Sequence, residues 1–187
     1  MTQQSQPQTQ TTTVWKLDPN HTLVEFVAKH MMITTVRGRF GGVQGTIVLD
    51  EANPANSSVE VEIDVSTINS GVDYRDNHLK SADFFEVEKF PKMTFKSTRV
   101  EPEGSDRAKV TGNLTIRDVT REVTLDTELT GRGKNPMGQE VVAFEAKTTI
   151  NRKDFGLNWN VALETGGFLV NDNIKIEIAA EGIKQDS

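Results

Sequence analysis

The feature that most constrains this chain is a strict alternation of apolar and polar residues. In residues 59–65, valine and isoleucine occupy every odd position, while glutamate and aspartate occupy the even positions. Successive side chains of a β-strand point to opposite faces, so a period of two predicts half-buried strands. The same period returns in residues 24–30, 93–96, 110–116, 123–129, 144–150 and 174–181.

Turn-forming residues separate these alternating segments. They lie at Asn53-Pro54, Pro102-Glu103-Gly104, Arg117-Asp118, residues 131–138 and Asn171-Asp172-Asn173. Residues 38–45 are strand-like but rich in glycine, which predicts a bulge or a sharp bend where a barrel turns a corner.

Residues 71–90 break the alternation. Asp76 is placed to cap a short helix that carries His78, Leu79 and Lys80. We expect a long loop with one or two helical turns, laid over one end of the structure. Because strands precede and follow it, this segment decorates one domain and does not link two.

The count is about eight strands with short turns, and no helical pattern of 10–15 residues lies between them. The pattern therefore argues against parallel βαβ units and favours an all-β fold class, either a sandwich or a barrel. Eight strands make a barrel that side chains can just fill or that holds one small ligand, and periodicity does not separate these cases. We expect one domain over residues 14–184 and a disordered polar tail over residues 1–13.

Composition narrows the function. The net charge of −6 argues against a nucleic-acid partner and against electrostatic docking on anionic membranes. The absence of cysteine excludes disulfides, thiolate catalysis and cysteine metal sites. No apolar run approaches the roughly 20 residues of a membrane helix, so no stable membrane insertion is expected. Residues 1–13 lack the features of a signal peptide, so we expect a cytoplasmic location, or a periplasmic or secreted one if a signal was removed.

Several short motifs are more specific than the periodicity. In order and spacing they resemble the YceI-like family of lipid-binding proteins over about residues 14–183. The motifs are WKLDPNHT (15–22), VRGRF (36–40), YRDNHL (74–79), FFEV (84–87), FPKMTF (90–95), GNLTIRDVT (112–120), NRKDFGL (151–157) and LVND (169–172).

The resemblance implies an extended, lipocalin-like antiparallel β-barrel of eight strands with a short helical segment at one end. It implies that a polyisoprenoid, an isoprenoid quinone or a similar long-chain lipid is threaded along the interior, for carriage, storage or stress protection. It also implies no metal, no redox cofactor, no catalysis and a homodimer.

Physical chemistry is compatible with this implication, because burying an apolar chain gains about 25 cal/mol per Å². A tunnel of aromatic and branched residues supplies that burial without special chemistry. The alternative is that the same side chains pack a closed core and the barrel is only a scaffold. The candidate lining residues are Val24, Phe26, Phe40, Met93, Phe95, Leu114, Ile116, Phe155, Leu157, Trp159 and Phe168.

Polar residues in the motifs have two interpretations each. His30 shares a face with Val24 and Phe26, and it is either a hydrogen-bonded core residue or a contact to a ligand head group at the mouth. Three polar residues lie in the segment 71–90, over one end of the barrel. They either cap a helix and form a surface ion pair, or they act as a lid that orders the polar end of the ligand. These loop residues are Arg75, Asp76 and His78.

The rival class is an enzyme or a metal-dependent protein that uses histidine, aspartate or arginine at the barrel mouth. The chain has no G-x-S-x-G elbow, no P-loop and no thiol. His21, His30 and His78 lack a metal-ligand spacing and could converge only in three dimensions. We expect Arg152 and Asp154 to form a structural pair beside Phe155.

Overall fold

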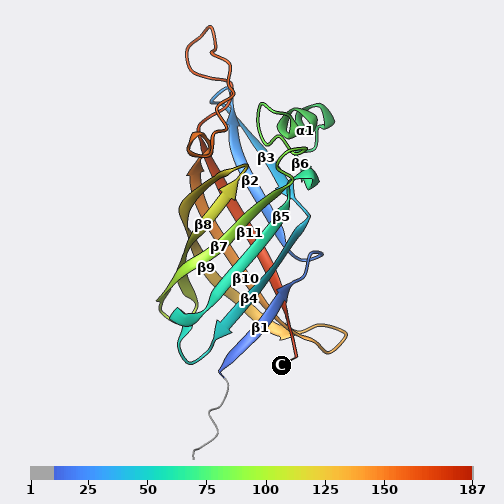
Figure 1. Cartoon of the computed structure of the whole chain (residues 1–187), viewed down its shortest axis with the longest axis vertical. Coiled ribbons are helices and arrows are strands. Elements are labelled where there is room, and N and C mark those ends of the chain that lie inside the picture. The colour runs from blue at the N-terminus through green and yellow to red at the C-terminus, as the bar shows by residue number, and fades with distance from the viewer. Residues whose placement is uncertain (1–10, 187) are drawn as a thin grey trace, which may run out of the picture.

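The computed structural model describes residues 11–186, which form a closed antiparallel β-barrel with loops and one helix at one end (Figure 1). The strand segments are β1 (Thr12–Leu17), β2 (Leu23–His30), β3 (Thr34–Phe40), β4 (Val43–Asp50), β5 (Ser58–Asp64), β6 (Ile68–Asn69), β7 (Lys92–Glu103), β8 (Arg107–Ile116), β9 (Val119–Lys134), β10 (Glu140–Asn151) and β11 (Asn173–Lys184). The helical segments are η1 (Pro54–Asn56), η2 (Val65–Thr67), α1 (Asp73–Lys80) and η3 (Arg152–Phe155).

These eleven segments make eight barrel strands, because three of the strands are interrupted. β11 pairs with β2 through residues 175–179 and with β1 through residues 182–184, so β1 and β2 follow one strand path. β3 and β4 are likewise separated only by Gly41-Gly42, and β5 and β6 only by η2. The predicted eight-stranded antiparallel barrel is therefore confirmed, including the bend in residues 38–45.

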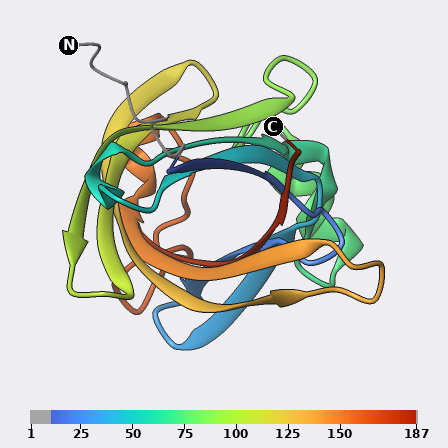
Figure 2. The ribbon, with the colours of Figure 1, turned by 90° about the horizontal axis from the view of Figure 1, so that it is seen from below.

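The barrel closes where β1 pairs with β11. Trp15 is opposite Lys184 and Leu17 is opposite Gly182 at this seam. The side chain of Trp15 is buried there, and a Cβ atom on Gly182 would lie 3.0 Å from the Trp15 Cβ. The view along the axis shows the resulting ring of strands (Figure 2). Within residues 11–186, closure pairs the two ends of the sheet, although residues 34–38 of β3 pair with β2 on one side only.

The segment between β6 and β7 lies at one end, together with the β2–β3 turn and the loop between η3 and β11 (Figure 1). We call this end of the barrel the α1 end. The prediction that Asp76 caps the helix is wrong, because α1 begins at Asp73 with Val72 as its N-cap residue. The Asp76 carboxylate accepts hydrogen bonds from the Ser70 backbone N–H (2.8 Å) and hydroxyl (2.6 Å). No helix among the described residues is long and apolar enough to span a bilayer.

Two predicted turns are shorter in the structure, because the strands extend into them. β7 continues through Pro102 and Glu103, and β9 continues through Gly131 and Gly133. At the other end of the chain, β1 starts at Thr12, two residues before the expected start of the fold. The rest of the predicted tail, residues 1–10, lies outside the described residues.

The pairing of Gly38 with Phe26 generates a stability prediction. A Cβ on Gly38 would collide with the ring of Phe26, the residue opposite it on β2. We expect Gly38→Ala to destabilise the fold by about 1–3 kcal/mol through overpacking, and to lower the melting temperature by several degrees. Gly41→Ala is the matched control, since a Cβ there has no neighbour within 4 Å. Equal melting temperatures for the two variants would contradict this packing.

Candidate functional site

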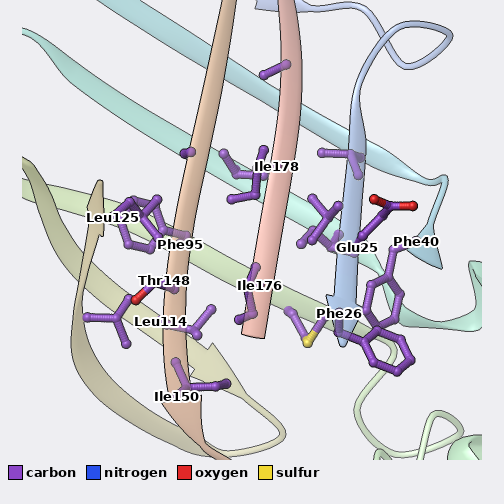
Figure 3. A pocket seen from close by; sticks show the side chains of 18 of the residues that line it. Glu25, Phe26, Phe40, Phe95, Leu114, Leu125, Thr148, Ile150, Ile176 and Ile178 are labelled. Carbon is purple, nitrogen blue, oxygen red and sulfur yellow. The ribbon is translucent and has the colours of Figure 1, made fainter. Parts of the chain in front are cut away.

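A cavity of about 690 Å³ runs along the inside of the barrel. Inward-facing side chains from all eight barrel strands line it, and they are almost entirely apolar. Phe26, Phe95, Leu114, Ile176 and Ile178 point into a common space from four different strands (Figure 3). The volume falls in the range of about 300–1,000 Å³ that small-molecule sites occupy.

The inward side chains do not fill this space. Along β9, Val123 and Leu125 face inward but are only partly buried, and Ile176 and Ile178 on β11 are in the same state. A side chain in a filled core would be close to fully buried, because protein interiors are close-packed. Of the two alternatives that periodicity left open, the structure therefore has the hollow barrel.

Most of the predicted ligand-binding residues line the cavity. The apolar ones come from β2, β3, β7 and β8 and from the loop after η3, and the polar ones lie at the α1 end. The residues are Val24, Phe26, His30, Phe40, Arg75, His78, Met93, Phe95, Leu114, Ile116, Leu157 and Trp159.

Three predicted residues lie elsewhere. Asp76 is held by Ser70 and does not reach the cavity. Phe155 is 1% exposed and is packed into the protein core behind the cavity wall. Phe168 is exposed on the loop before β11, where the Lys153 ammonium lies 5.9 Å from its ring centroid. Asp76 and Phe155 lie in quoted motifs and Phe168 directly precedes one, but a motif carries no information on which way a loop side chain points.

Much of the wall was missed because the prediction followed the motifs. Val61, Leu125, Phe144, Ile176 and Ile178 all line the cavity and none lies in a quoted motif. The signal was present in the alternation, which puts each of them on the apolar face of its segment. Assigning the apolar face of every predicted strand to the barrel interior would have included them.

An aromatic cluster covers part of the mouth at the α1 end. The rings of His78 and Trp159 are 4.5 Å apart at their centroids and perpendicular, and Phe84 lies 5.4 Å from Trp159. His78 Nε2 also contacts the Asp83 carboxylate at 2.8 Å. The cluster thus joins the α1 segment to the loop after η3, and it forms a boundary that is apolar towards the cavity.

The side chains of Arg75 and His30 face the same mouth. Arg75 donates from Nε to the Ser70 hydroxyl and from Nη2 to the Ser70 carbonyl, each at 2.8 Å. Within the described residues its Nη1 has no acceptor. His30 lines the mouth at the exposed end of β2, which matches the mouth interpretation and not the core one.

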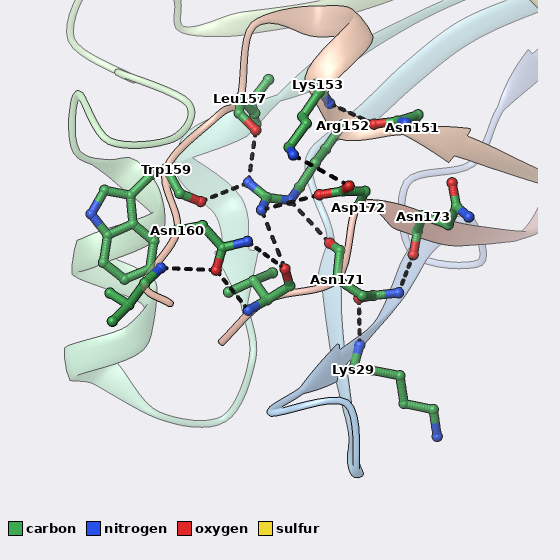
Figure 4. Close-up of polar contacts among 12 residues, drawn as sticks. Lys29, Asn151, Arg152, Lys153, Leu157, Trp159, Asn160, Asn171, Asp172 and Asn173 are labelled. Atoms are coloured by element: carbon green, nitrogen blue, oxygen red, sulfur yellow. Dashed lines mark hydrogen bonds and ion pairs between the residues drawn. The ribbon is translucent and has the colours of Figure 1, made fainter. Parts of the chain in front are cut away.

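Arg152 holds the loop between η3 and β11 from inside the protein (Figure 4). Its Nη1 donates to the carbonyls of Leu157 (2.7 Å) and Trp159 (2.8 Å), and its Nε donates to that of Asn171 (3.0 Å). One buried guanidinium therefore fastens both legs of the loop. Burial lowers the pKa of Arg152, and the Asp172 carboxylate opposes that shift.

The expected pair of Arg152 with Asp154 is wrong. Arg152 Nη2 lies 3.7 Å from the carboxylate of Asp172, which directly precedes β11. Asp154 is exposed while Arg152 is buried, so the two side chains leave η3 on different sides.

The three histidines do not form a metal set. Among residues 11–186, the one group with metal-ligand spacing is Asp18, His21 and Glu181. Its geometry belongs to a turn, in which Asp18 accepts from the Asn20 N–H (2.9 Å) and contacts His21 Nδ1 (2.7 Å).

The YceI-like domain model matches residues 15–182. The chain belongs to the YceI-like family. A UPF0312 protein of Staphylococcus aureus (strain bovine RF122 / ET3-1) is 39% identical over 170 residues, covering 90% of this chain and 96% of that protein. A second UPF0312 protein, from strain MSSA476, has the same identity and coverage.

Solved structures of YceI-like and related proteins have the same fold. A Campylobacter jejuni YCEI protein is 32% identical with a TM-score of 0.73, over 84% of this chain and 90% of that one. Burkholderia cenocepacia BcnA is 24% identical with a TM-score of 0.77, over 88% and 98%. A polyisoprenoid binding domain from Saccharophagus degradans is 16% identical with a TM-score of 0.65, over 91% and 98%. The last two likenesses show the fold alone.

The Arg152 contacts predict a large loss of stability on truncation. Arg152→Met removes the donors to four carbonyls, those of Leu157, Trp159, Val170 and Asn171, and should cost about 3 kcal/mol or more. Faster amide hydrogen exchange in residues 156–171 is the local measurement. Arg37→Met is the control, because Arg37 forms only an exposed ion pair with Glu177 and should change stability by under about 1 kcal/mol. Equal unfolding free energies for the two variants would contradict the assignment.

The Asp18–His21 turn predicts a pH dependence. The hydrogen bond to Asp18, assisted by Glu181, raises the pKa of His21 above 6.5, and the same bond lowers the pKa of Asp18 below 3.8. The stabilisation linked to His21 is complete below its unfolded pKa and is lost as pH rises through the folded one. The part linked to Asp18 is lost as pH falls through its folded pKa. In an NMR titration, Asp18→Asn should return the His21 pKa towards 6.5, and an unchanged value would contradict the pairing.

Proposed function

We propose that this protein binds a long apolar isoprenoid inside the barrel. The observation that carries the proposal is the continuous cavity of about 690 Å³ with an apolar wall. A chain built from C5 units is flexible, narrow and almost purely apolar, so it suits a long hollow better than a compact ligand does. Each Å² of apolar surface removed from water contributes about 25 cal/mol.

Two further observations support this ligand class. The chain is a member of the YceI-like family, and a structural neighbour is described as a polyisoprenoid binding domain. The partly buried side chains of β9 and β11 also present apolar surface to the hollow. Such surface gains its remaining burial when a ligand of the same polarity enters.

The α1 end is the place we propose for the polar end of the ligand. Arg75 is oriented by two hydrogen bonds to Ser70 and has one nitrogen left for a carbonyl or phosphate oxygen. His30 lies at the same mouth. The indole of Trp159 packs on His78 there, which gives the first segment of the apolar chain a flat surface.

We further propose a binding role without catalysis, with carriage of the lipid as its purpose. The polar groups at the mouth are engaged in contacts that hold loops, as His78 is with Asp83 and Arg75 with Ser70. These contacts support anchoring of a ligand, and they do not resemble a nucleophile activated by a base. The homodimer stays a prediction.

Filling the hollow is the first test of the ligand. Ala146 faces the cavity from β10, and Ala146→Trp should occupy ligand space with apolar atoms while keeping the fold. We expect the lipid recovered by organic extraction and mass spectrometry to fall at least about tenfold relative to the unchanged protein. Lys147→Trp places the same ring on the outer face and is the control. Full lipid retention in Ala146→Trp would show that the ligand lies elsewhere.

A charge in the wall is the second test. Phe95→Asp puts a carboxylate against the apolar chain, where a desolvated charge costs several kcal/mol. Lipid should be lost from this variant and kept in Thr94→Asp, whose side chain is exposed on the same strand. Circular dichroism confirms that each variant is folded. A folded Phe95→Asp that still carries lipid would refute the lining assignment.

A further inference from the structure

Two hairpin ends at the α1 end carry exposed apolar side chains. The β2–β3 turn presents Met31, Met32 and Ile33, of which Met32 is 60% and Ile33 76% exposed. The loop before β11 presents Val161 and Phe168, the latter 51% exposed. We call these five residues the apical tip. Large apolar side chains gathered at one place on a surface usually mark an interaction site.

The apical tip is one unit, although its residues come from distant parts of the chain. The Met31 N–H donates to the Leu169 carbonyl (2.8 Å), and His30 pairs with Val170. Phe168 pairs with Ala162 in a small hairpin of its own. Arg152 fastens both legs of that loop to the barrel. Figure 1 shows this loop projecting beyond the strands.

The β2–β3 turn has an unfavourable backbone for its sequence. The φ angles of Met31 (53°) and Met32 (62°) are both positive, and the Ile33 N–H donates to the His30 carbonyl at 3.0 Å. These contacts define a β-turn over residues 30–33, within a three-residue connection between the paired residues His30 and Thr34, and positive φ at both central positions favours Asn-Gly there. Methionine at both positions is therefore conformationally strained, and backbone strain of this kind is common at functional sites.

The apical tip adjoins the cavity mouth. His30, Leu169 and Val170 line the cavity, and each is next to or one residue from a tip residue along the chain. An apolar cargo has to leave one apolar phase and enter another without crossing water. If the apolar side chains beside the mouth were immersed in lipid, the apolar interior of the cavity would be continuous with the lipid layer.

We propose that the apical tip inserts into the interfacial layer of a lipid bilayer and sets the cavity mouth against it. The inference rests on the proposed apolar cargo. Insertion is by apolar burial, since the net charge of −6 opposes attraction to anionic lipid. A second copy of the chain is the less suitable occupant. The tip is a pair of projecting hairpin ends, whereas a stable interface buries about 800 Å² of each partner.

Flotation with phosphatidylcholine vesicles tests the proposal on the whole chain. Met31→Asn combined with Met32→Gly gives the turn its favoured sequence, so this double variant should fold with an equal or higher melting temperature. We expect it to bind vesicles at least about tenfold more weakly than the unchanged protein, as two partly immersed side chains are lost. Met137→Asn is the control, since Met137 is 79% exposed at the opposite end and its loss should not matter.

The outcomes separate the possible explanations. Unchanged vesicle binding by the double variant, or no binding by the unchanged protein, overturns the proposal. A double variant that changes from dimer to monomer in sedimentation while flotation is unchanged also overturns it, in favour of an interface between copies. Lipid extracted from the same preparations reports the cargo independently. A protein that carries lipid but does not float therefore refutes the docking alone, and one that floats without cargo refutes the proposed ligand alone.

Discussion

The pairing of β1 with β11 is the constraint on which the other features of this protein depend. Three residue pairs at the seam convert a sheet into a closed barrel, with Trp15 buried beside Gly182. Closure forces every apolar face of the alternating strands towards one axis. Eight strands enclose more space than these particular side chains fill, and the result is a hollow with an apolar wall.

The two ends of the hollow differ in chemistry. At the α1 end, buried Arg152 and the ring cluster of His78, Phe84 and Trp159 hold loops in place around a mouth. At the other end, charged groups such as Glu51 and Arg132 form bidentate contacts at the rim. Fixed loops at one end and apolar side chains beside them are the features expected where a lipid enters and leaves.

The sequence predicted the strands because alternation is a local signal that survives in every strand, and the resemblance to the YceI-like family selected a barrel over a sandwich. The sequence also predicted the bend at residues 38–45, since glycine there permits a close approach to Phe26. Its choice of loop residues that reach the cavity was only partly right: His78 and Trp159 line it, but some other predicted loop residues do not. Asp76 and Phe168 lie in segments without a period, and their orientation is decided by partners such as Ser70 that are fixed only in the fold. The prediction for the partner of Arg152 was wrong for the same reason, because Asp172 approaches from the end of the loop before β11.

The central claim is that a lipid occupies a dry hollow through the length of the barrel. Native mass spectrometry of gently purified protein measures this most directly. The account predicts a mass above that of the bare chain, released into organic solvent as an apolar compound with C5 repeats. A bare-chain mass, from a protein whose cavity exchanges freely with water, would contradict it.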